Sequence, residues 1–250
     1  MKRINNFLIT LFLGNNIPDK NIRPAIQNQV RNVKQVWNNE TYNDFGVERL
    51  FRLFLTLFQF FSIGLYVRHI SGWFGLLGRK VGVEILVLAK LAFPILLLTC
   101  GWTAPTWTAN VAAYLLVDTI IYLNYLIFLT DVNTKPITYK RSLVTLFHNY
   151  IEVALNFAVI YSHCNLVYKE FFSRQLKNNF ESVYFSFITT ATVGYGDIYP
   201  NTTFGQFLTV SQVILFFIFV GLFLNFYASK VETKSYFNEE LKFKKREAKK

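Results

Sequence analysis

The hydrophobic positions of this chain fall into long runs that are separated by short polar stretches. Four such runs lie at roughly 83–103, 111–130, 142–163 and 204–228. At about 1.5 Å per residue in a helix, each run can cross the ~30 Å hydrocarbon core of a bilayer. The pattern therefore predicts an all-α membrane protein with four spanning helices.

A fifth apolar run, 53–67, contains no charge and is flanked by Arg49, Arg52 and Arg68. As a helix it would be only about 22 Å long, which is short for a span. We expect this run to lie in the membrane interface or against the helix bundle. Five spans is the alternative.

The first 48 residues are polar and rich in Asn. After Pro24, apolar residues recur at the i, i+4, i+7, i+11 spacing of an amphipathic helix, at Ile26, Val30, Val33 and Trp37. One hypothesis is a helix that lies on the cytoplasmic headgroups or packs beneath the membrane domain. The other is a solvated helix that covers part of a core.

The basic residues, which give the chain a net charge of +11, are concentrated on one side of the predicted spans. The connection 104–110 carries no Lys or Arg, whereas the first 52 residues and the segment after 229 carry eight each. Because basic loops stay in the cytoplasm, both termini are expected there, in a multi-pass protein of the plasma membrane. The same rule accounts for the charge without a nucleic-acid partner.

A polar run separates the last two spans, and in it Gly194 and Gly196 alternate with Val193 and Tyr195. Glycine readily takes φ > 0, so alternate residues can turn successive carbonyls to the same side of an extended backbone. Such a strand can line a narrow tube with oxygens, and Thr192 adds a hydroxyl at one mouth. A monovalent cation could exchange its water shell for these oxygens.

The run Thr192-Val193-Gly194-Tyr195-Gly196-Asp197 resembles the selectivity filter of the potassium channel family, whose pore-loop module has two helices. The resemblance covers roughly 142–228. It implies an outer helix, a pore helix from Phe180 to Thr189, the filter with Gly196 as its last glycine, and an inner helix from Phe204. It also implies K⁺ binding by the carbonyls of Thr192, Val193, Gly194 and Tyr195 and by the Thr192 hydroxyl. One filter loop cannot encircle an ion, so a homotetramer in membrane lipid is expected.

The resemblance also points to residues that support the filter and the gate. Tyr184 and Phe185 stand where the family commonly has a tryptophan pair, and the Tyr184 hydroxyl can donate to Asp197. Where many relatives have a hinge glycine, this chain has Phe216. Gly221 follows five residues later and is expected to act as a displaced hinge or to allow close helix packing.

Several polar residues fall at membrane depth. His148, Glu152 and Asn156 recur at i, i+4, i+8 and share one helix face, and Lys90 lies at a depth that permits a pair with Glu152. The alternative is that Lys90 snorkels to the interface and the face only joins helices. No apolar run carries the regularly spaced arginines of a voltage sensor.

We divide the chain into a cytoplasmic N-terminal region (1–48), accessory membrane helices (49–141), the pore module (142–229) and a basic cytoplasmic tail (230–250). The expected function is passive K⁺ conduction without a cofactor. The alternatives are a nonselective cation channel, a K⁺ transporter subunit with the same pore-loop fold, or a non-conducting scaffold.

We find no nucleophile with a base, no metal cluster and no phosphate loop, so an enzyme is not expected. Cys100 and Cys164 are expected to fill apolar space without a bridge.

Overall fold

The computed structural model describes residues 24–40, 43–129, 132 and 139–224. In these ranges the regular elements are helices, and Phe172 and Pro200 form an isolated antiparallel bridge. The predicted tail (230–250) and the first 23 residues lie outside the described residues.

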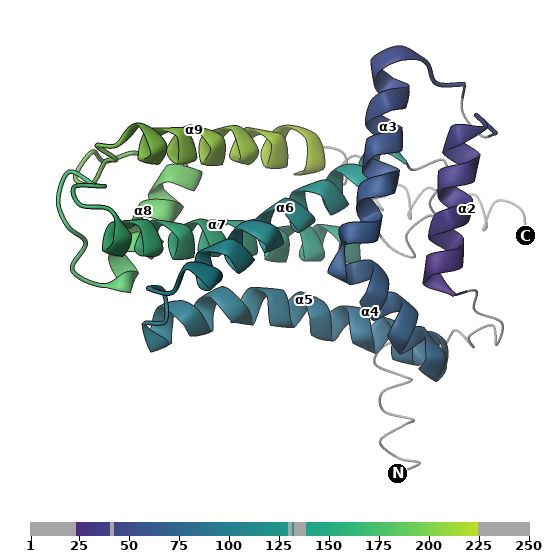
Figure 1. The fold of residues 1–250 in the computed structure, drawn as a ribbon, viewed down its shortest axis with the longest axis horizontal. Coiled ribbons are helices and arrows are strands. Elements are labelled where there is room, and N and C mark those ends of the chain that lie inside the picture. The colour runs from purple at the N-terminus through teal and green to yellow at the C-terminus, as the bar shows by residue number, and fades with distance from the viewer. Residues whose placement is uncertain (1–23, 41–42, 130–131, 133–138, 225–250) are drawn as a thin grey trace, which may run out of the picture.

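Four long helices run lengthwise through the molecule (Figure 1). They are α5 (Gly75–Cys100), α6 (Thr106–Phe128), α7 (Tyr139–Val167) and α9 (Thr203–Ile218). Within the described residues, four segments are long and apolar enough to cross a membrane: Ile63–Cys100, Thr106–Phe128, Leu143–Val167 and Thr203–Gly221. The four-span, all-helical prediction is confirmed at this level, and the chain is a multi-pass membrane protein.

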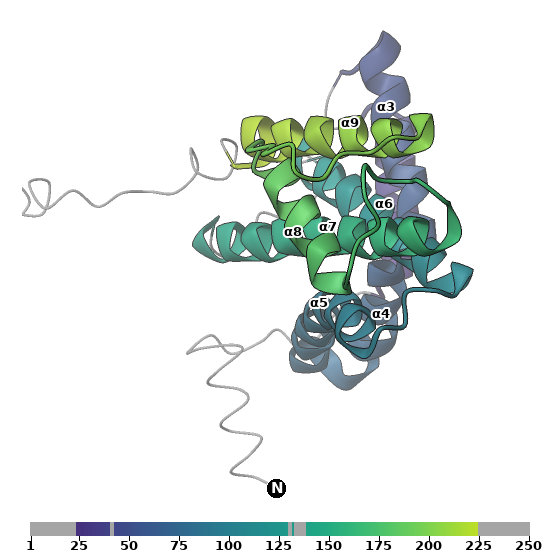
Figure 2. The same ribbon diagram turned by 90° about the vertical axis from the view of Figure 1, so that its left-hand side faces the viewer.

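Helix α7 forms the centre of the bundle. Seen end-on, α9 lies on one side of it and α5 on the other, with α6 and the short helix α8 (Asn179–Thr190) beside it (Figure 2). In α7, 61% of the spanning window is buried inside the chain, compared with 17% in α9. Helix α9 therefore has an apolar surface that one chain leaves uncovered.

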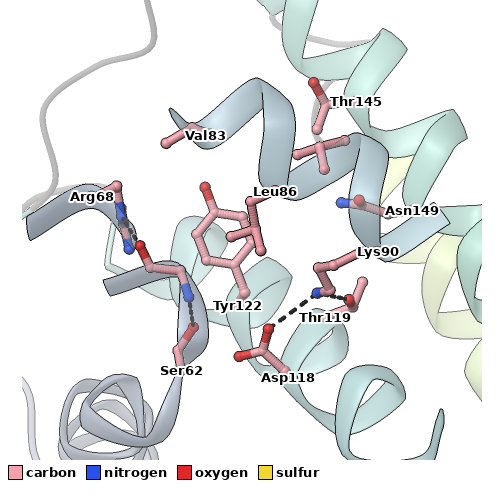
Figure 3. A pocket seen from close by; sticks show the side chains of 12 residues that line it. Ser62, Arg68, Val83, Leu86, Lys90, Asp118, Thr119, Tyr122, Thr145 and Asn149 are labelled. Atoms are coloured by element: carbon pink, nitrogen blue, oxygen red, sulfur yellow. Dashed lines mark hydrogen bonds and ion pairs between the residues drawn. The ribbon is translucent and has the colours of Figure 1, made fainter. Parts of the chain in front are cut away.

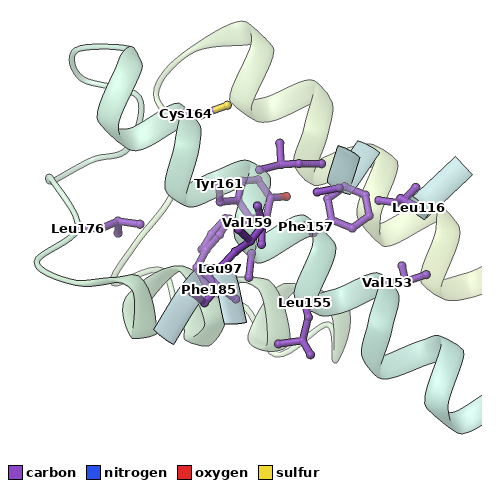
Figure 4. Packing of buried hydrophobic residues seen from close by; sticks show 14 of the residues in the cluster. Leu97, Leu116, Val153, Leu155, Phe157, Val159, Tyr161, Cys164, Leu176 and Phe185 are labelled. Atoms are coloured by element: carbon purple, nitrogen blue, oxygen red, sulfur yellow. The ribbon is translucent and has the colours of Figure 1, made fainter. Parts of the chain in front are cut away.

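The core lies around the second half of α7, where Phe157, Ala158, Val159 and Tyr161 are buried (Figure 4). Removing such apolar area from water contributes roughly 25 cal/mol per Å² in a soluble protein. In a bilayer, close packing replaces much of that driving force. The core therefore holds α8 against α7 mainly through close packing of side chains.

The fifth apolar run does not form one helix. It is divided between α3 (Gly46–Phe58), a 3₁₀ turn (Gln59–Phe61) and α4 (Ile63–Ser71). Ser62 breaks the run because it has extended backbone angles and its hydroxyl caps α4 by accepting from Gly64 N at 3.3 Å. Helix α3 crosses the end of the bundle instead of running along it (Figure 1). This arrangement agrees with four spans.

Helix α5 begins earlier than the predicted start at 83, because its first turns pack against α4. A Cβ added at Gly78 would lie 2.7 Å from the carbonyl oxygen of Ser71, and one at Gly82 would lie 2.6 Å from the Ser71 Cβ. These glycines let the chain fold back, and Gly75 makes the turn with φ of 83°. The long segment Ile63–Cys100 is therefore two helices, of which α5 is the span.

Helix α2 (Ala25–Trp37) forms where the sequence predicted it, but its predicted apolar face is not the buried one. Val30 and Trp37 are exposed, whereas Gln29 is buried. Gln29 Nε2 donates to the Thr56 carbonyl at 2.8 Å, and Gln29 Oε1 accepts from the Tyr125 hydroxyl at 3.1 Å. Polar contacts to α3 and α6 therefore set the rotation of α2.

Candidate functional site

The short helix α8 occupies the place predicted for the pore helix. Its N-terminus is capped by the Asn178 side chain, which accepts from Glu181 N at 3.0 Å. At the other end, Val193 N and Gly194 N both reach back to the Ile188 carbonyl, at 2.9 and 3.4 Å. The chain thus leaves the last turn of α8 directly into the filter segment.

The filter segment alternates in backbone conformation. Thr192, Gly194 and Gly196 have φ of 56°, 55° and 78°, all in the left-handed region. The alternation at the glycines matches the sequence prediction. The left-handed Thr192 was not predicted, because a residue with a Cβ enters this region at a cost of about 1–2 kcal/mol.

The filter side chains have no cover within one chain. Val193 is 50% exposed and Tyr195 is 71% exposed, and residues 191–197 are all exposed. Irregular backbone at membrane depth is tolerated only where protein buries it or where it lines a water-filled cavity. The described residues of one chain do not bury this segment, which leaves it to face a water-filled cavity or further protein.

The two predicted support residues on α8 face different ways. Tyr184 lies near Asp197. Phe185 is 3% exposed and packs edge-on against Tyr161 and Phe172, each with ring centroids 4.9 Å away. The structure thus brings Tyr184 together with Asp197, while Phe185 anchors α8 to α7 (Figure 4).

A buried amide behind the filter was not identified from the sequence. Gln212 of α9 is 1% exposed, and its Nε2 donates to the Ser186 carbonyl at 3.0 Å and to the Ser186 hydroxyl at 2.8 Å. It also donates to the Thr190 hydroxyl, and its Oε1 accepts from the Tyr161 hydroxyl at 2.8 Å. The Ser186 hydroxyl in turn donates to the Ala154 carbonyl of α7 at 2.6 Å. These residues, which we call the Gln212 network, join α7, α8 and α9.

A signal for this network was present in the sequence. Gln212 is the last polar residue of α9 before the apolar run 213–218, and Ser186 and Thr190 are spaced i, i+4 on α8. Polar groups at such places are expected to bond across helices.

An ion pair lies beside the outer end of α8. Arg174 donates to Glu181 with both guanidinium nitrogens, at 2.7 and 3.2 Å, and Lys177 N donates to the same carboxylate at 2.9 Å. The bonds from Arg174 and then from Lys177 N lower the pKa of Glu181. Partial desolvation, followed by the effect of the nearby Asp197 carboxylate, raises the pKa of Tyr184.

The two gate candidates lie at the far end of α9. Phe216 packs on Tyr150 of α7 with ring centroids 6.2 Å apart. Gly221 lies in the π-helical segment Phe219–Leu224, and a Cβ there would meet no other element within 4 Å. Close packing at Gly221 is therefore not made by the residues that the structure describes, and π-helical turns often occur at functional sites.

Both cysteines are free: Cys100 is exposed and Cys164 is buried.

A scan against family models matches residues 150–233 to a model described as "Ion channel". No curated protein and no solved structure matches the chain. The matched range contains the second half of α7, all of α8, the filter segment and α9. Over this range, about a third of the chain, the sequence is similar to an ion-channel family, and the family description names no particular ion.

Proposed function

We propose that this protein is the subunit of a potassium-selective channel that conducts K⁺ passively across the membrane. The observation that carries the proposal is the alternation of left-handed residues at Thr192, Gly194 and Gly196, directly after the pore helix. Alternation of this kind turns successive carbonyls to one side. A row of such oxygens can replace the hydration shell of K⁺.

The proposed ion ligands are the carbonyls of Thr192, Val193, Gly194 and Tyr195 and the hydroxyl of Thr192. Helix α8 supports this assignment because its C-terminus ends at Thr190, next to the filter. The C-terminal end of a helix carries the partial negative charge of its macrodipole. This end favours a cation nearby without binding it permanently.

Four copies of the chain would surround the ion as a cyclic homotetramer. The uncovered filter side chains support this assembly, and so does the outer face of α9. That face carries exposed apolar side chains at Phe207, Val210, Ile214 and Phe217. Neighbouring chains and membrane lipid are the partners that such a face requires.

In the proposed orientation the filter end faces outward from the plasma membrane and both termini are cytoplasmic. The basic residues Arg68, Arg79 and Lys80 belong to the α4–α5 hairpin, at the end opposite the filter (Figure 1). Basic segments are retained on the cytoplasmic side. Conduction in this scheme uses neither a cofactor nor an arginine-repeat voltage sensor.

The alternative is a nonselective cation channel or a K⁺ transporter subunit with the same pore-loop fold. The uninterrupted Thr-Val-Gly-Tyr-Gly sequence favours the selective channel. The ratio of K⁺ to Na⁺ permeability separates the two classes.

Substitution of Gly194 tests the proposal. In G194A, the added Cβ meets no atom within 4 Å in one chain, but its φ of 55° costs an alanine roughly 1–2 kcal/mol. We expect the strand to relax and the K⁺ preference to be lost in reconstituted liposomes. The matched control is G46A, where φ is 59° and a Cβ also meets nothing within 4 Å, far from the filter. Intact K⁺-selective flux in G194A would refute the assignment.

A further inference from the structure

A cluster of charges lies in the middle of the helix bundle, away from the filter. Lys90 Nζ of α5 lies 3.1 Å from Asp118 Oδ2 of α6 and 3.7 Å from Glu152 Oε1 of α7. The predicted Lys90–Glu152 pair is therefore present. Asp118, which lies beside Lys90 in Figure 3, was not predicted as a partner. Its contact with Lys90 is the shorter of the two.

Hydrogen bonds hold the cluster together. Lys90 Nζ donates to the Thr119 hydroxyl, which lies 3.1 Å from each oxygen of Glu152. Asn156 Nδ2 donates to Glu152 Oε1 at 3.4 Å. Asn156 Oδ1 is buried and has no hydrogen-bond partner among the described residues. A half-turn of the amide would offer this oxygen to a protonated Glu152 as an acceptor.

The cluster has two carboxyl groups and one ammonium group. Glu152 is 3% exposed and Asp118 is also buried, so a fully ionised cluster holds one uncompensated negative charge. Such a charge costs several kcal/mol at membrane depth. A single proton balances the cluster. Asp118 has the closer contact with Lys90, so Glu152 is the group that takes the proton.

A cavity connects the cluster to the α4 side of the molecule. It has a volume of about 90 Å³, with Lys90, Asp118 and Thr119 at one end and Ser62 and Arg68 on α4 and its cap (Figure 3). Most of the cavity lining is apolar, and the polar groups that can hold water in it are those of Lys90, Asp118 and Thr119 at the cluster end and of Ser62 and Arg68 at the other. The titratable groups that face the cluster through the cavity are Arg68 of α4 and Tyr122 of α6. Tyr114 of α6 also interacts with Asp118, and on α7 itself His148 lies one turn before Glu152.

Helix α7 links the cluster to the pore. Ala154 follows Glu152 by two residues, and its carbonyl accepts from Ser186 of the pore helix at 2.6 Å. Ser186 also accepts from Gln212 of α9. A shift of α7 at Glu152 therefore acts directly on the element that positions the filter.

We propose that Lys90, Asp118 and Glu152 form a proton-binding site that is reached from the α4 side, and that its occupancy modulates conduction. The effect on conduction rests on the proposed channel function. With the proton bound, the cluster is neutral and packed. Without it, the excess charge draws in water and loosens α7 from α5 and α6.

Infrared spectroscopy of the purified protein near neutral pH tests the site without any need for conduction. The wild type should show the carbonyl band of a buried protonated carboxyl group. E152Q should lack the band. D118N should also lack it, because one carboxylate and one ammonium balance without a proton. H148N is the control and should keep the band. A band that persists unchanged in both E152Q and D118N would overturn the site.

Flux measurements test the coupling. As the pH on the α4 side changes from about 9 to about 5, K⁺ flux through the wild type should change roughly 2- to 30-fold. E152Q should show the low-pH flux of the wild type at every pH, whereas H148N should respond as the wild type does. A pH response retained in E152Q would overturn the coupling. Absence of K⁺-selective flux in every variant would instead refute the proposed function and leave the infrared result standing.

Discussion

Replacing Gln212 of α9 with Leu removes the amide that joins α8 to α7 and α9. In Q212L, the Ser186 and Thr190 hydroxyls lose their donor from α9, and the Tyr161 hydroxyl loses its acceptor at 2.8 Å. Ser186 keeps its bond to the Ala154 carbonyl. The expected effect is a pore helix that is still anchored to α7 but released from α9.

The magnitude follows from the bonds that are lost. The amide of Gln212 has two donor hydrogens, and the interhelical hydrogen bonds that they make average about 0.6 kcal/mol each in membranes. The buried Tyr161 hydroxyl loses its short bond and keeps only the long contact with the Thr209 hydroxyl at 3.5 Å, which adds about 1–3 kcal/mol. Together the loss is about 3 kcal/mol, or roughly a hundredfold in the unfolding equilibrium.

Equilibrium unfolding in detergent micelles measures this loss, and the K⁺/Na⁺ permeability ratio in liposomes measures its effect on the filter. Y161F removes the hydroxyl that loses its short bond in Q212L. The double variant should therefore lose about 1–2 kcal/mol less unfolding free energy than the two single variants lose together. S211A is the matched control, because Ser211 is partly exposed on the same helix and its hydroxyl donates to the Phe207 carbonyl of its own helix. Wild-type stability in Q212L, or strict additivity with Y161F, would refute the reasoning.

Two further predictions concern the surroundings of the filter. In G205A, the added Cβ would lie 2.8 Å from Pro200 Cβ, so the overpacking against Pro200 should cost about 1–3 kcal/mol of unfolding free energy, and an unchanged unfolding curve would contradict the contact. The Arg174–Glu181 pair lowers the pKa of Glu181 from its ordinary value of 4.5, so its stabilisation is complete above pH 4.5 and is lost as the pH falls through the lowered value. The stability difference between wild type and E181Q should therefore be constant at neutral pH and shrink in acid, and a difference that grows in acid would contradict this sign.

The spanning helices could be predicted because the bilayer fixes both their length and their polarity, whatever they pack against. Depth along a helix is equally predictable from the rise per residue, and the possible Lys90–Glu152 pair followed from it. Asp118 was missed as a partner because the rotation of α6 about its own axis depends on its neighbours. The same limit applies to Gln212, whose polarity was visible in the sequence but whose direction was not.

The backbone preferences and hydrophobic spacing of the sequence predicted only part of the local structure. The glycines of the filter segment predicted left-handed residues at 194 and 196. Thr192 takes the same conformation against its own preference, because Thr192 N is held by the Thr189 carbonyl at 3.0 Å and Val193 N by that of Ile188. In α2, hydrophobic spacing predicted the helix but indicated the wrong buried face, because Gln29 satisfies its amide against α3 and α6.

The central claim is that the carbonyls of residues 192–195 from four chains replace the water around K⁺. Its most direct test is the flux of K⁺ and Na⁺ through the purified protein in liposomes, measured on particles whose mass is determined in the same preparation. The account predicts particles of four chains that pass K⁺ and largely exclude Na⁺. Particles of one chain, or equal flux of the two ions, would contradict it.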